Sequence, residues 1–281
     1  MAVERVSDIL RAVDREGYGV ISFAAFNLES ISWVLEVAEE EGAPVLLMEY
    51  PTYNAMMPFS TFAAVVKDLA SKAHIPVGLM LDHGPSFETA LAAAAGGFTS
   101  VMVDFSGENY EENVRKTREV VKACHAMGID VEGEVGHVGD ADTESDYLNA
   151  DNYTDPRIAV EYLERTGVDQ LAVSIGTAHG NYVSEPHLDI DRLKQLNAAT
   201  DTPLVLHGGS GVPDSQLRAA FSNGINKLNI ATHYNQIIYS AVEEVVSGHK
   251  SATPRISDCM KAAKPRVQAY IRHLIHIGRG K

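Results

Sequence analysis

Short hydrophobic runs alternate with amphipathic stretches from one end of the chain to the other. Apolar runs of four to eight residues bounded by turn-forming residues are typical of buried strands, and apolar positions that recur every three to four residues are typical of helices. The runs predict eight strands, at Val20–Ala24, Pro44–Met48, Val77–Asp82, Ser100–Asp104, Asp130–Val135, Gln170–Ser174, Leu204–His207 and Lys227–Ile230. The amphipathic stretches predict eight helices, at Ser30–Glu41, Phe59–Ala73, Ser86–Ala95, Glu111–Met127, Asp155–Thr166, Asp189–Ala199, Pro213–Ser222 and His233–Ser247.

Strictly alternating strands and helices indicate an α/β fold. Eight strand–helix units are the number that closes a (β/α)8 TIM barrel. A doubly wound open sheet is the alternative, but such sheets usually have fewer strands and bind ligands at one switch point. Because no repeat, low-complexity segment or linker interrupts the pattern, we expect residues 1–281 to form a single domain.

Two connections are unusually long. Gly136–Thr154, after the fifth strand, is rich in Asp, Gly, Ser and Asn, which predicts a mobile loop. Long loops in compact domains are usually functional. The tail Gly248–Lys281 follows the eighth helix, and we expect it to carry an extra helix near Ile256–His276.

Three histidines, His83, His179 and His207, follow three of the predicted strands, and each directly precedes a glycine. In a barrel, the carboxyl ends of all strands lie on one face, which is the face that carries active sites. Three imidazoles that converge there form a catalytic metal site with one position left open for substrate. A histidine considered alone is more often structural or on the surface, which is our interpretation of others such as His74 and His125.

Carboxylates on the same strands are candidates for acid–base chemistry. Strand alternation points Asp82 into the barrel, where it could act as an acid or base. The alternative is that Asp82 orients a ligating histidine. Glu132 and Glu134 share one face of the fifth strand, so both are expected to point inward. Buried carboxylates need a cation, which a metal or Lys227 would supply.

A glycine-rich segment, His207–Pro213, follows the seventh strand. Its backbone N–H groups and the Ser210 hydroxyl can surround a phosphate. The eighth strand ends in Lys227–Thr232, and the loops after strands seven and eight of a barrel frequently form a phosphate site. Lys227 also allows a different chemistry, because an inward lysine can form a Schiff base with a ketone. A metal site and a Schiff base would perform the same task, which disfavours this alternative.

The composition excludes several classes of partner. The formal net charge of −15 argues against binding to nucleic acid or to an anionic membrane surface. The two cysteines, Cys124 and Cys259, form no CxxC pair and are expected to be reduced and buried. No run reaches the ~18 apolar residues of a membrane span, and the N-terminus lacks the apolar stretch of a signal peptide. We therefore expect a cytoplasmic protein.

Five segments together resemble the class II, metal-dependent ketose-bisphosphate aldolases in order and spacing. They are Leu81–Gly84, Glu132–Gly136, Gly176–Gly180, His207–Ser210 and Asn229–Thr232. The last reads Asn-Ile-Ala-Thr, which is similar to the tagatose-bisphosphate branch, whereas many fructose-bisphosphate aldolases have Asn-x-Asp-Thr. The resemblance covers nearly the whole chain. It implies a lyase that reversibly cleaves a ketose 1,6-bisphosphate of the fructose or tagatose type, or a related ketose 1-phosphate, to dihydroxyacetone phosphate and an aldehyde.

The resemblance also implies roles for individual residues. His83, His179 and His207 would hold a catalytic Zn²⁺, and Glu134 matches a glutamate of a second or alternative metal position. Asp82 would be the acid/base at the C4 oxygen. Residues that would hold dihydroxyacetone phosphate, often with a monovalent cation (Na⁺ or K⁺) nearby, are Gly180, Gly208, Gly209, Ser210, Asn229, Ile230, Ala231 and Thr232.

Two further matches extend the implied site. Asn27 matches an asparagine that contacts substrate. Arg255 matches an arginine that family members supply to the neighbouring subunit's site, so a homodimer or homotetramer is expected.

Three departures from the family pattern concern the aldehyde half of the substrate and the catalytic loop. The loop reads Gly139-Asp-Ala-Asp142 where the family has Gly-Gly-x-Glu-Asp, so either Asp142 or Glu144 would take the catalytic role. His137 replaces an arginine or a similar residue. Glu49 stands where small or hydroxyl residues usually lie near the aldehyde phosphate, and a carboxylate there would repel phosphate.

These departures predict a non-standard aldehyde, which could be non-phosphorylated, sulfonated or of the deoxy-keto sugar acid type. Three other functions stay open. A Schiff-base aldolase would use Lys227. A sugar-phosphate-binding barrel without catalysis would retain the pocket and lose the chemistry of the loop. A metal-dependent hydrolase on the same barrel would make less use of the glycine-rich segment.

Overall fold

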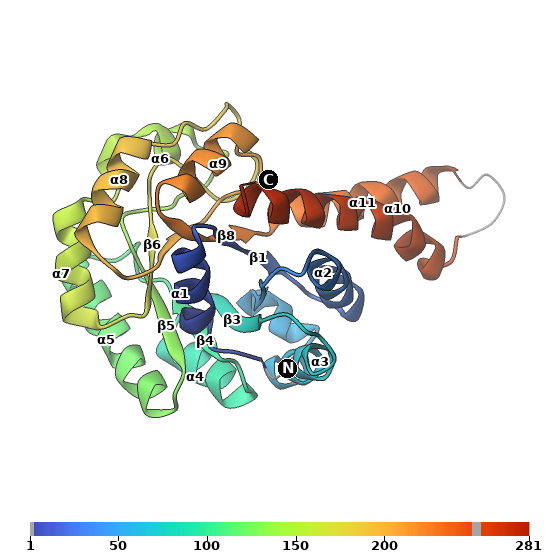
Figure 1. The fold of residues 1–281 in the computed structure, drawn as a ribbon, viewed down its shortest axis with the longest axis horizontal. Coiled ribbons are helices and arrows are strands. Elements are labelled where there is room, and N and C mark those ends of the chain that lie inside the picture. Colours follow the sequence, from blue (N-terminus) through green and yellow to red (C-terminus); the bar gives the residue numbers. More distant parts are fainter. Residues whose placement is uncertain (1–2, 249–253, 281) are drawn as a thin grey trace.

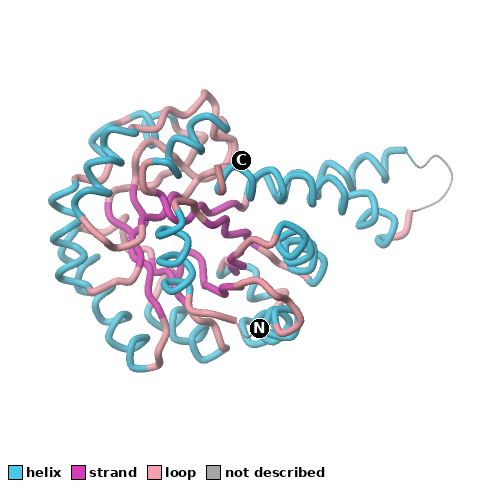
Figure 2. Tube along the Cα trace, in the orientation of Figure 1, coloured by secondary structure: helices cyan, strands magenta, loops and turns pink. Residues whose placement is uncertain are grey.

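The computed structural model describes residues 3–248 and 254–280, and it shows a closed barrel of eight parallel strands in the order β1 to β8. This confirms the predicted TIM barrel. The strands lie at the centre and helices surround them (Figure 2). The strands are β1 (Val20–Ala24), β2 (Val45–Glu49), β3 (Val77–Gly84), β4 (Ser100–Val103), β5 (Asp130–Val135), β6 (Gln170–Val173), β7 (Leu204–Leu206) and β8 (Ile225–Ile230).

Each predicted helix is present, with ends shifted by a few residues. The helices are α1 (Val6–Glu16), α2 (Leu28–Glu41), α3 (Phe59–Ala70), α4 (Phe87–Gly96), α5 (Tyr110–Ala126), α6 (Glu144–Leu148), α7 (Pro156–Thr166), α8 (Ile190–Ala199), α9 (Asp214–Ser222), α10 (Thr232–Gly248) and α11 (Ile256–Gly278), with 3-10 turns η1 (Pro51–Ala55) and η2 (Ala150–Asn152). Polar caps fix several helix starts, because their oxygens accept hydrogen bonds from otherwise unpaired N–H groups. Asn27 accepts from the Ser30 N–H at 2.8 Å, and Ser86 accepts from the Thr89 N–H at 3.1 Å.

Side chains of each strand alternate between two hydrophobic layers. On β2, Leu46 and Met48 join the cluster inside the barrel, whereas Val45 and Leu47 join the cluster between the strands and the helices. Because both faces of a parallel strand are buried, its sequence is a continuous apolar run rather than an alternating one. The alternation therefore decides which polar side chains at the strand ends reach the barrel axis.

Helix α1 covers the N-terminal end of the barrel (Figure 1) and was not predicted. Its apolar side chains follow helical spacing, since Val6, Ile9, Leu10 and Val13 are all buried in the inner cluster. That spacing is the sequence signal that could have identified it. At its start, the Ser7 N–H donates a hydrogen bond to Asp130 at 2.9 Å. Asp130 is the first residue of β5, so this bond joins the helix to the N-terminal end of the barrel.

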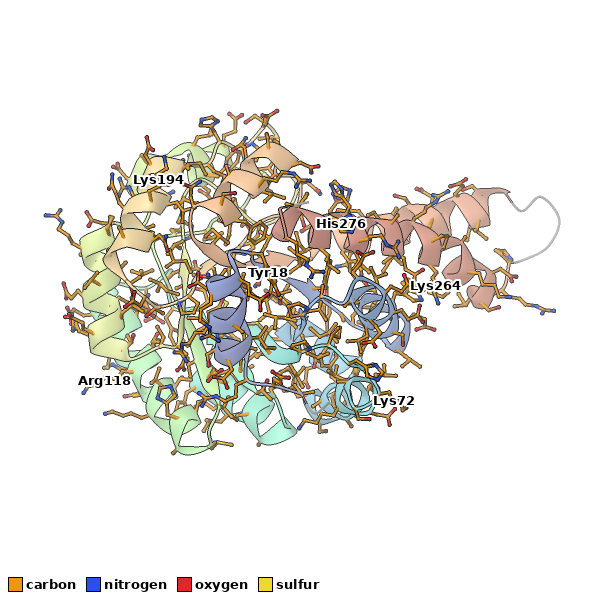
Figure 3. All side chains as sticks on the ribbon, in the orientation of Figure 1. Tyr18, Lys72, Arg118, Lys194, Lys264 and His276 are labelled. Atoms are coloured by element: carbon orange, nitrogen blue, oxygen red, sulfur yellow. The ribbon has the colours of Figure 1, made fainter. Side chains whose placement is uncertain are left out.

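The last two helices, α10 and α11, run side by side and project from the barrel as an arm (Figure 1). The arm includes the predicted extra helix; residues 249–253 and 281 of the predicted tail lie outside the described residues. Figure 3 places Lys264 on this arm and Lys72, Arg118 and Lys194 at the outer rim of the helices. Within residues 3–248 and 254–280, no helix is long and apolar enough to cross a membrane.

The segment Gly136–Thr154 has more structure than its polar composition predicted. It contains α6 and η2, and its Ala141 and Tyr147 side chains are fully buried. The Tyr147 ring packs edge-on against Tyr182, with ring centroids 5.0 Å apart. This aromatic contact helps to hold the loop against the connection between β6 and α8.

Candidate active site

Three histidines meet at the carboxyl ends of the strands, as predicted. His83 lies near the end of β3, His207 directly follows β7, and His179 lies in the loop after β6. The Nε2 atom of His83 lies 2.8 Å from Nδ1 of His207 and 3.1 Å from Nε2 of His179. One nitrogen from each ring therefore faces a common point, which is the donor set of a metal site with three protein ligands.

A distortion of β3 brings both Asp82 and His83 to this point. Neighbouring residues of a regular strand point to opposite faces, so only one of them could otherwise face the barrel axis. The register of β3 against β4 shifts between Leu81 and Gly84, and His83 has a φ of 43°. No other non-glycine residue in the described part of the chain has a positive φ. Such strain persists where the surrounding structure enforces it, and it concentrates at functional sites.

Carboxylates contact His83 and His207 through the ring nitrogens that point away from the common point. His83 Nδ1 lies 3.0 Å from Oδ2 of Asp104, and His207 Nε2 lies 2.8 Å from Oε1 of Glu132. Such contacts fix the tautomer and the orientation of ligating histidines. The nitrogens that face the common point are thereby left free to bind a cation.

The electrostatics favour one positive charge at this point. Burial alone would lower the pKa of His83, but the carboxylates of Asp82 and Asp104 raise it to about 9. Burial lowers the pKa of His179 and of His207, and the charge on His83 lowers both further. A divalent metal requires all three imidazoles to be neutral, so on binding it would displace the proton of His83 and take over the positive charge that Asp82 and Asp104 favour at this point.

Glu132 and Lys227 form a buried ion pair beneath the histidines. Lys227 Nζ lies 2.5 Å from Oε2 of Glu132, and both side chains are fully buried. Burial would raise the pKa of Glu132, but the charge of Lys227 lowers it to about 2. The pair confirms that the inward glutamate has a cationic partner. It also argues against the Schiff-base alternative, because an ammonium held by a carboxylate is a poor nucleophile.

Glu134, the other inward glutamate, has no cationic partner of this kind. Its Oε2 atom is buried without a hydrogen-bond partner, and burial together with the charge of Asp104 raises its pKa to about 8. One oxygen of Glu134 lies within 4.8 Å of ligand atoms of both His83 and Asp104. These three residues are a second donor set that could hold a cation, which would neutralise the buried carboxylates.

Two adjoining cavities open onto the histidines. The smaller, of about 30 Å³, lies between the histidines and the ends of β7 and β8. The larger, of about 510 Å³, continues outward over η1 and the loop Gly136–Thr154. We call the first the histidine end and the second the open end. The histidine end is lined by Met48, Asp82, His83, His179, Gly180, His207, Gly208, Ser210, Asn229, Ala231 and Thr232.

Backbone geometry at the histidine end suits an anion. Gly208 has a φ of 67°, and a Cβ there would lie 2.3 Å from the carbonyl oxygen of Ala178, so the loops after β6 and β7 can approach only at a glycine. Helix α10 begins at Thr232, and the first N–H groups of a helix lack partners within it. One of them, the N–H of His233, donates to the Ser210 hydroxyl at 3.2 Å. Glycine loops and a helix N-terminus together are a suitable phosphate site.

Several predicted residues lie away from both cavities. The Ile230 side chain packs in the outer hydrophobic cluster, and Gly209 faces Leu228, so either could offer only backbone groups. The Asn27 side chain caps α2. Asp142 and Glu144 are exposed on the loop and do not line either cavity.

Arg255 also lies outside the cavities of its own chain. It is exposed and immediately precedes α11, in the projecting arm of Figure 1. Its guanidinium therefore adds no charge to the lining of its own chain's cavities.

The predicted position of Glu49 near the aldehyde phosphate is wrong. Glu49 pairs in register with Leu81, which belongs to the outer cluster, and it lines neither cavity. Strand alternation directs its side chain toward the helices, because Met48 takes the inward position. Neither carboxylate oxygen has a hydrogen-bond partner, and burial raises the pKa of Glu49 to about 8.

At the open end, the structure adds residues that the sequence did not indicate to Asp82, His83, His179, Ala231 and Thr232, which it did. The open end is lined by Ala24, Tyr50, Tyr53, Asp82, His83, Pro85, Asp104, Asp140, His179, Ala231, Thr232 and Asn235. Asp104 could have been identified, since it directly follows the apolar run of β4. Asp140 pairs with His179 through backbone bridges, with the Ala141 N–H donating to the His179 carbonyl at 2.8 Å. No local pattern marks that contact between two loops.

A closed (β/α)8 barrel with three converging histidines at its strand ends defines an enzyme-like barrel with a candidate metal centre. The model of the class II fructose-bisphosphate aldolases matches residues 4–279 of this chain. The chain belongs to that family, which confirms the resemblance read from the sequence.

Individual relatives agree with this assignment. The chain is 40% identical over 227 residues to the uncharacterized protein YdjI of Escherichia coli K12, covering 81% of this chain and 82% of YdjI. It is 38% identical over 252 residues to a probable fructose-bisphosphate aldolase of Bacillus subtilis, covering 88% and 87% of the two chains. The crystal structure of the E. coli YdjI aldolase superimposes with a TM-score of 0.87 at 33% identity, covering 99% of this chain and 97% of YdjI.

Proposed function

We propose that this protein is a metal-dependent aldolase that reversibly cleaves a ketose 1-phosphate or 1,6-bisphosphate to dihydroxyacetone phosphate and an aldehyde. The observation that carries the proposal is the convergence of three histidine nitrogens beside a glycine-lined anion site. His83, His179 and His207 would hold Zn²⁺, with Glu134 and Asp104 at the second donor set. When bound, the metal supplies a Lewis acid that stabilises negative charge on a substrate carbonyl oxygen.

The residues of the histidine end would bind and orient dihydroxyacetone phosphate. Gly180, Gly208 and Ser210 line this cavity together with Ala231 and Thr232, which lie at the start of α10. Gly209 and Ile230 would contribute only through backbone groups. A Na⁺ or K⁺ ion beside the phosphate belongs to the same proposal. Holding the phosphate here leaves the remaining carbons of the ketose to extend into the open end.

Asp82 would accept the proton of the C4 hydroxyl as the C3–C4 bond breaks, and return it in the reverse reaction. Its side chain is almost fully buried, and Oδ1 accepts a hydrogen bond from Nδ2 of Asn229 at 3.0 Å. This contact fixes the orientation of the carboxylate while it remains in the lining of both cavities. A positioned general base contributes ~10²–10⁴ in rate.

The proton at C3 would be handled by a carboxylate of the loop Gly136–Thr154. Asp142 and Glu144 are the candidates from the family pattern, and either would need the loop to shift. Asp140 already lies in the cavity. Arg255, exposed on the arm, would serve the site of a neighbouring subunit in a homodimer or homotetramer. Asn27 would contact substrate.

Metal removal tests the proposal directly. The purified protein is treated with a chelator and its cleavage of fructose and tagatose 1,6-bisphosphates, or its addition of dihydroxyacetone phosphate to aldehydes, is measured by product formation. We expect activity to disappear and to return with Zn²⁺. Full activity in the metal-free protein, together with borohydride trapping of substrate on Lys227, would favour the Schiff-base mechanism instead. Absence of any turnover with metal present would favour a sugar-phosphate-binding barrel.

A further inference from the structure

The three candidate metal ligands are not supported in the same way. His83 and His207 contact carboxylates through the ring nitrogens that point away from the common point. Within residues 3–248 and 254–280, no carboxylate is hydrogen-bonded to the ring of His179, which instead bonds to the backbone of Val138. The placement of His179 therefore depends on how the loops around it are held together.

The hydroxyl of Tyr182 joins the two loops that carry His179 and His207. It accepts a hydrogen bond from the Ala178 N–H at 2.8 Å and donates one to the Gly208 carbonyl at 2.8 Å. Ala178 directly precedes His179 in the chain. Gly208 directly follows His207. One phenol oxygen therefore contacts the backbone next to two of the three candidate ligands.

Tyr182 is placed to hold the ligands and not to react. Its hydroxyl hydrogen is committed to the Gly208 carbonyl, and the side chain lines neither cavity. Burial raises the pKa of Tyr182, so the hydroxyl stays protonated and keeps its donor bond at neutral pH. The hydroxyl can therefore fix the separation of the two loops without taking part in proton transfer.

The ring of Tyr182 is itself packed, which fixes the position of the hydroxyl. A Cβ on Gly211, in the glycine-rich segment, would lie only 3.3 Å from the Tyr182 ring. Tyr147 packs edge-on against the same ring, with centroids 5.0 Å apart, and its hydroxyl accepts a hydrogen bond from the Ser184 N–H at 3.2 Å. Side chains whose rotamers are locked by packing position a site more precisely than free ones.

His179 is also bonded to the loop Gly136–Thr154 through both of its backbone groups. Its N–H donates to the Gly139 carbonyl at 2.8 Å, and its carbonyl accepts from the Ala141 N–H at 2.8 Å. These bonds hold His179 against one loop, whereas Tyr182 holds the preceding residue against the loop of His207. The separation of His179 and His207 thus depends on the Tyr182 hydroxyl.

We propose that Tyr182 is a positioning residue of the metal site, whose hydroxyl sets the separation of the loops that carry His179 and His207. The inference rests on the proposed metal-dependent function and deepens it. Without the hydroxyl, the Ala178 N–H and the Gly208 carbonyl lose their shared partner, so the two imidazoles are held less firmly for a cation. Partners behind metal ligands typically contribute about 10–100-fold to metal affinity.

Tyr182→Phe tests this role, because it keeps the packed ring and removes only the hydroxyl. The metal-free protein is titrated with Zn²⁺ in competition with a chelating dye, and with Co²⁺, whose visible spectrum reports coordination geometry. We expect Zn²⁺ to bind about tenfold more weakly than to the wild type, at the low end of the range because Tyr182 acts through the residues next to the ligands. The Co²⁺ spectrum should change as well.

Tyr234→Phe is the matched control. The Tyr234 side chain is fully buried, its hydroxyl donates to the Ser30 carbonyl at 2.9 Å, and it lines neither cavity. Urea unfolding of both metal-free variants shows the cost of losing a buried hydroxyl, and only Tyr182→Phe should also change metal binding.

The outcomes separate this inference from the proposed function. If the wild type binds Zn²⁺ and Tyr182→Phe binds it with the same affinity and the same Co²⁺ spectrum, the inference is wrong and the proposed function stands. Equal weakening of Zn²⁺ binding in Tyr182→Phe and Tyr234→Phe also overturns the inference, because it indicates a general loss of stability. If the wild type binds no Zn²⁺, the proposed function fails, and the inference fails with it.

Discussion

The histidine end and the open end share a wall of residues but are built in different ways. Asp82, His83 and His207 at the histidine end lie at strand ends or directly after them, and they are held by partners such as Asp104, Glu132 and Asn229. The open end is built from η1, the loop Gly136–Thr154 and the first turns of α10. Tyr50 there is 40% exposed, whereas His207 is fully buried.

This difference indicates how the barrel divides its tasks. Chemistry that depends on tenths of an ångström is best supported by rigid strands and a surrounding layer of hydrogen bonds. Selection between substrates can be changed by loops without disturbing that support. We therefore expect substitutions at the histidine end to reduce catalysis for every substrate. Substitutions of Tyr50, Tyr53 or Asn235 at the open end should instead change which aldehyde is preferred.

The largest effect should come from Asp82→Asn. The amide keeps the shape of the side chain but cannot accept the C4 proton, so kcat should fall by ~10²–10⁴ for all aldehydes alike. Steady-state cleavage and zinc content are measured together. Asp201→Asn, in the exposed turn before β7, is the control. Loss of activity for only some aldehydes would show that Asp82 acts in selection, and the division between the two ends would fail.

Glu132→Gln should have the next largest effect, on stability. It leaves the Lys227 ammonium buried without a counter-charge and weakens the support of His207. Removing one partner of a buried ion pair costs ~3–5 kcal/mol in the free energy of unfolding. Urea unfolding of the metal-free protein measures this cost. Glu134→Gln, two residues along the same strand, is the matched control, because no lysine depends on it. Equal destabilisation by both would contradict the proposed importance of the ion pair.

The histidine end could be predicted from the sequence because the carboxyl ends of all barrel strands lie together on one face. His83, His179, His207 and Asp82 followed from apolar runs and glycines alone. The bulge that admits both Asp82 and His83 could not be predicted, since it depends on the register of β3 against β4.

The open end could not be predicted, for two physical reasons. Asp140 reaches the cavity through backbone contacts between two loops that are distant in sequence. Glu49 was assigned to the cavity from its position after a strand, but a shift of one residue reverses the face of a strand, and Met48 occupies the inward position. The fold itself followed from the eight strand–helix units, apart from α1 and the short helical segments η1, α6 and η2.

Glu49→Gln should raise the free energy of unfolding without affecting the open end, because Glu49 is buried and does not line that cavity. The pKa of Glu49 is about 8 in the folded protein, against an ordinary value of 4.5. Below pH 4.5 both states are protonated. As pH rises from 4.5 to 8, the unfolded chain releases this proton while the folded protein retains it, so folding becomes less favourable; above 8 the loss is constant.

The Gln substitution removes that loss, and we expect it to raise the free energy of unfolding by ~2–3 kcal/mol at pH 8 and by little at pH 4.5, after allowing for a buried amide. Thermal or urea unfolding over this pH range provides the measurement, with Glu185→Gln as an exposed control. The aldehyde preference should stay that of the wild type. A changed preference would place Glu49 in the open end after all.

The smallest expected effect distinguishes the three loop carboxylates. Asp140 lines the open end, while Asp142 and Glu144 are exposed outside it. If the loop works in the conformation observed, Asp140→Asn should slow exchange of the C3 proton by about tenfold, near the low end for a general base, because solvent can partly replace an exposed carboxylate. Asp142→Asn and Glu144→Gln should then change the exchange rate by less than twofold. A larger effect of either one would show that the loop shifts on binding dihydroxyacetone phosphate, so that Tyr147 does not hold it in a single position. The exchange rate in D2O, measured without aldehyde for each variant, decides between a fixed loop and one that moves over the histidine end.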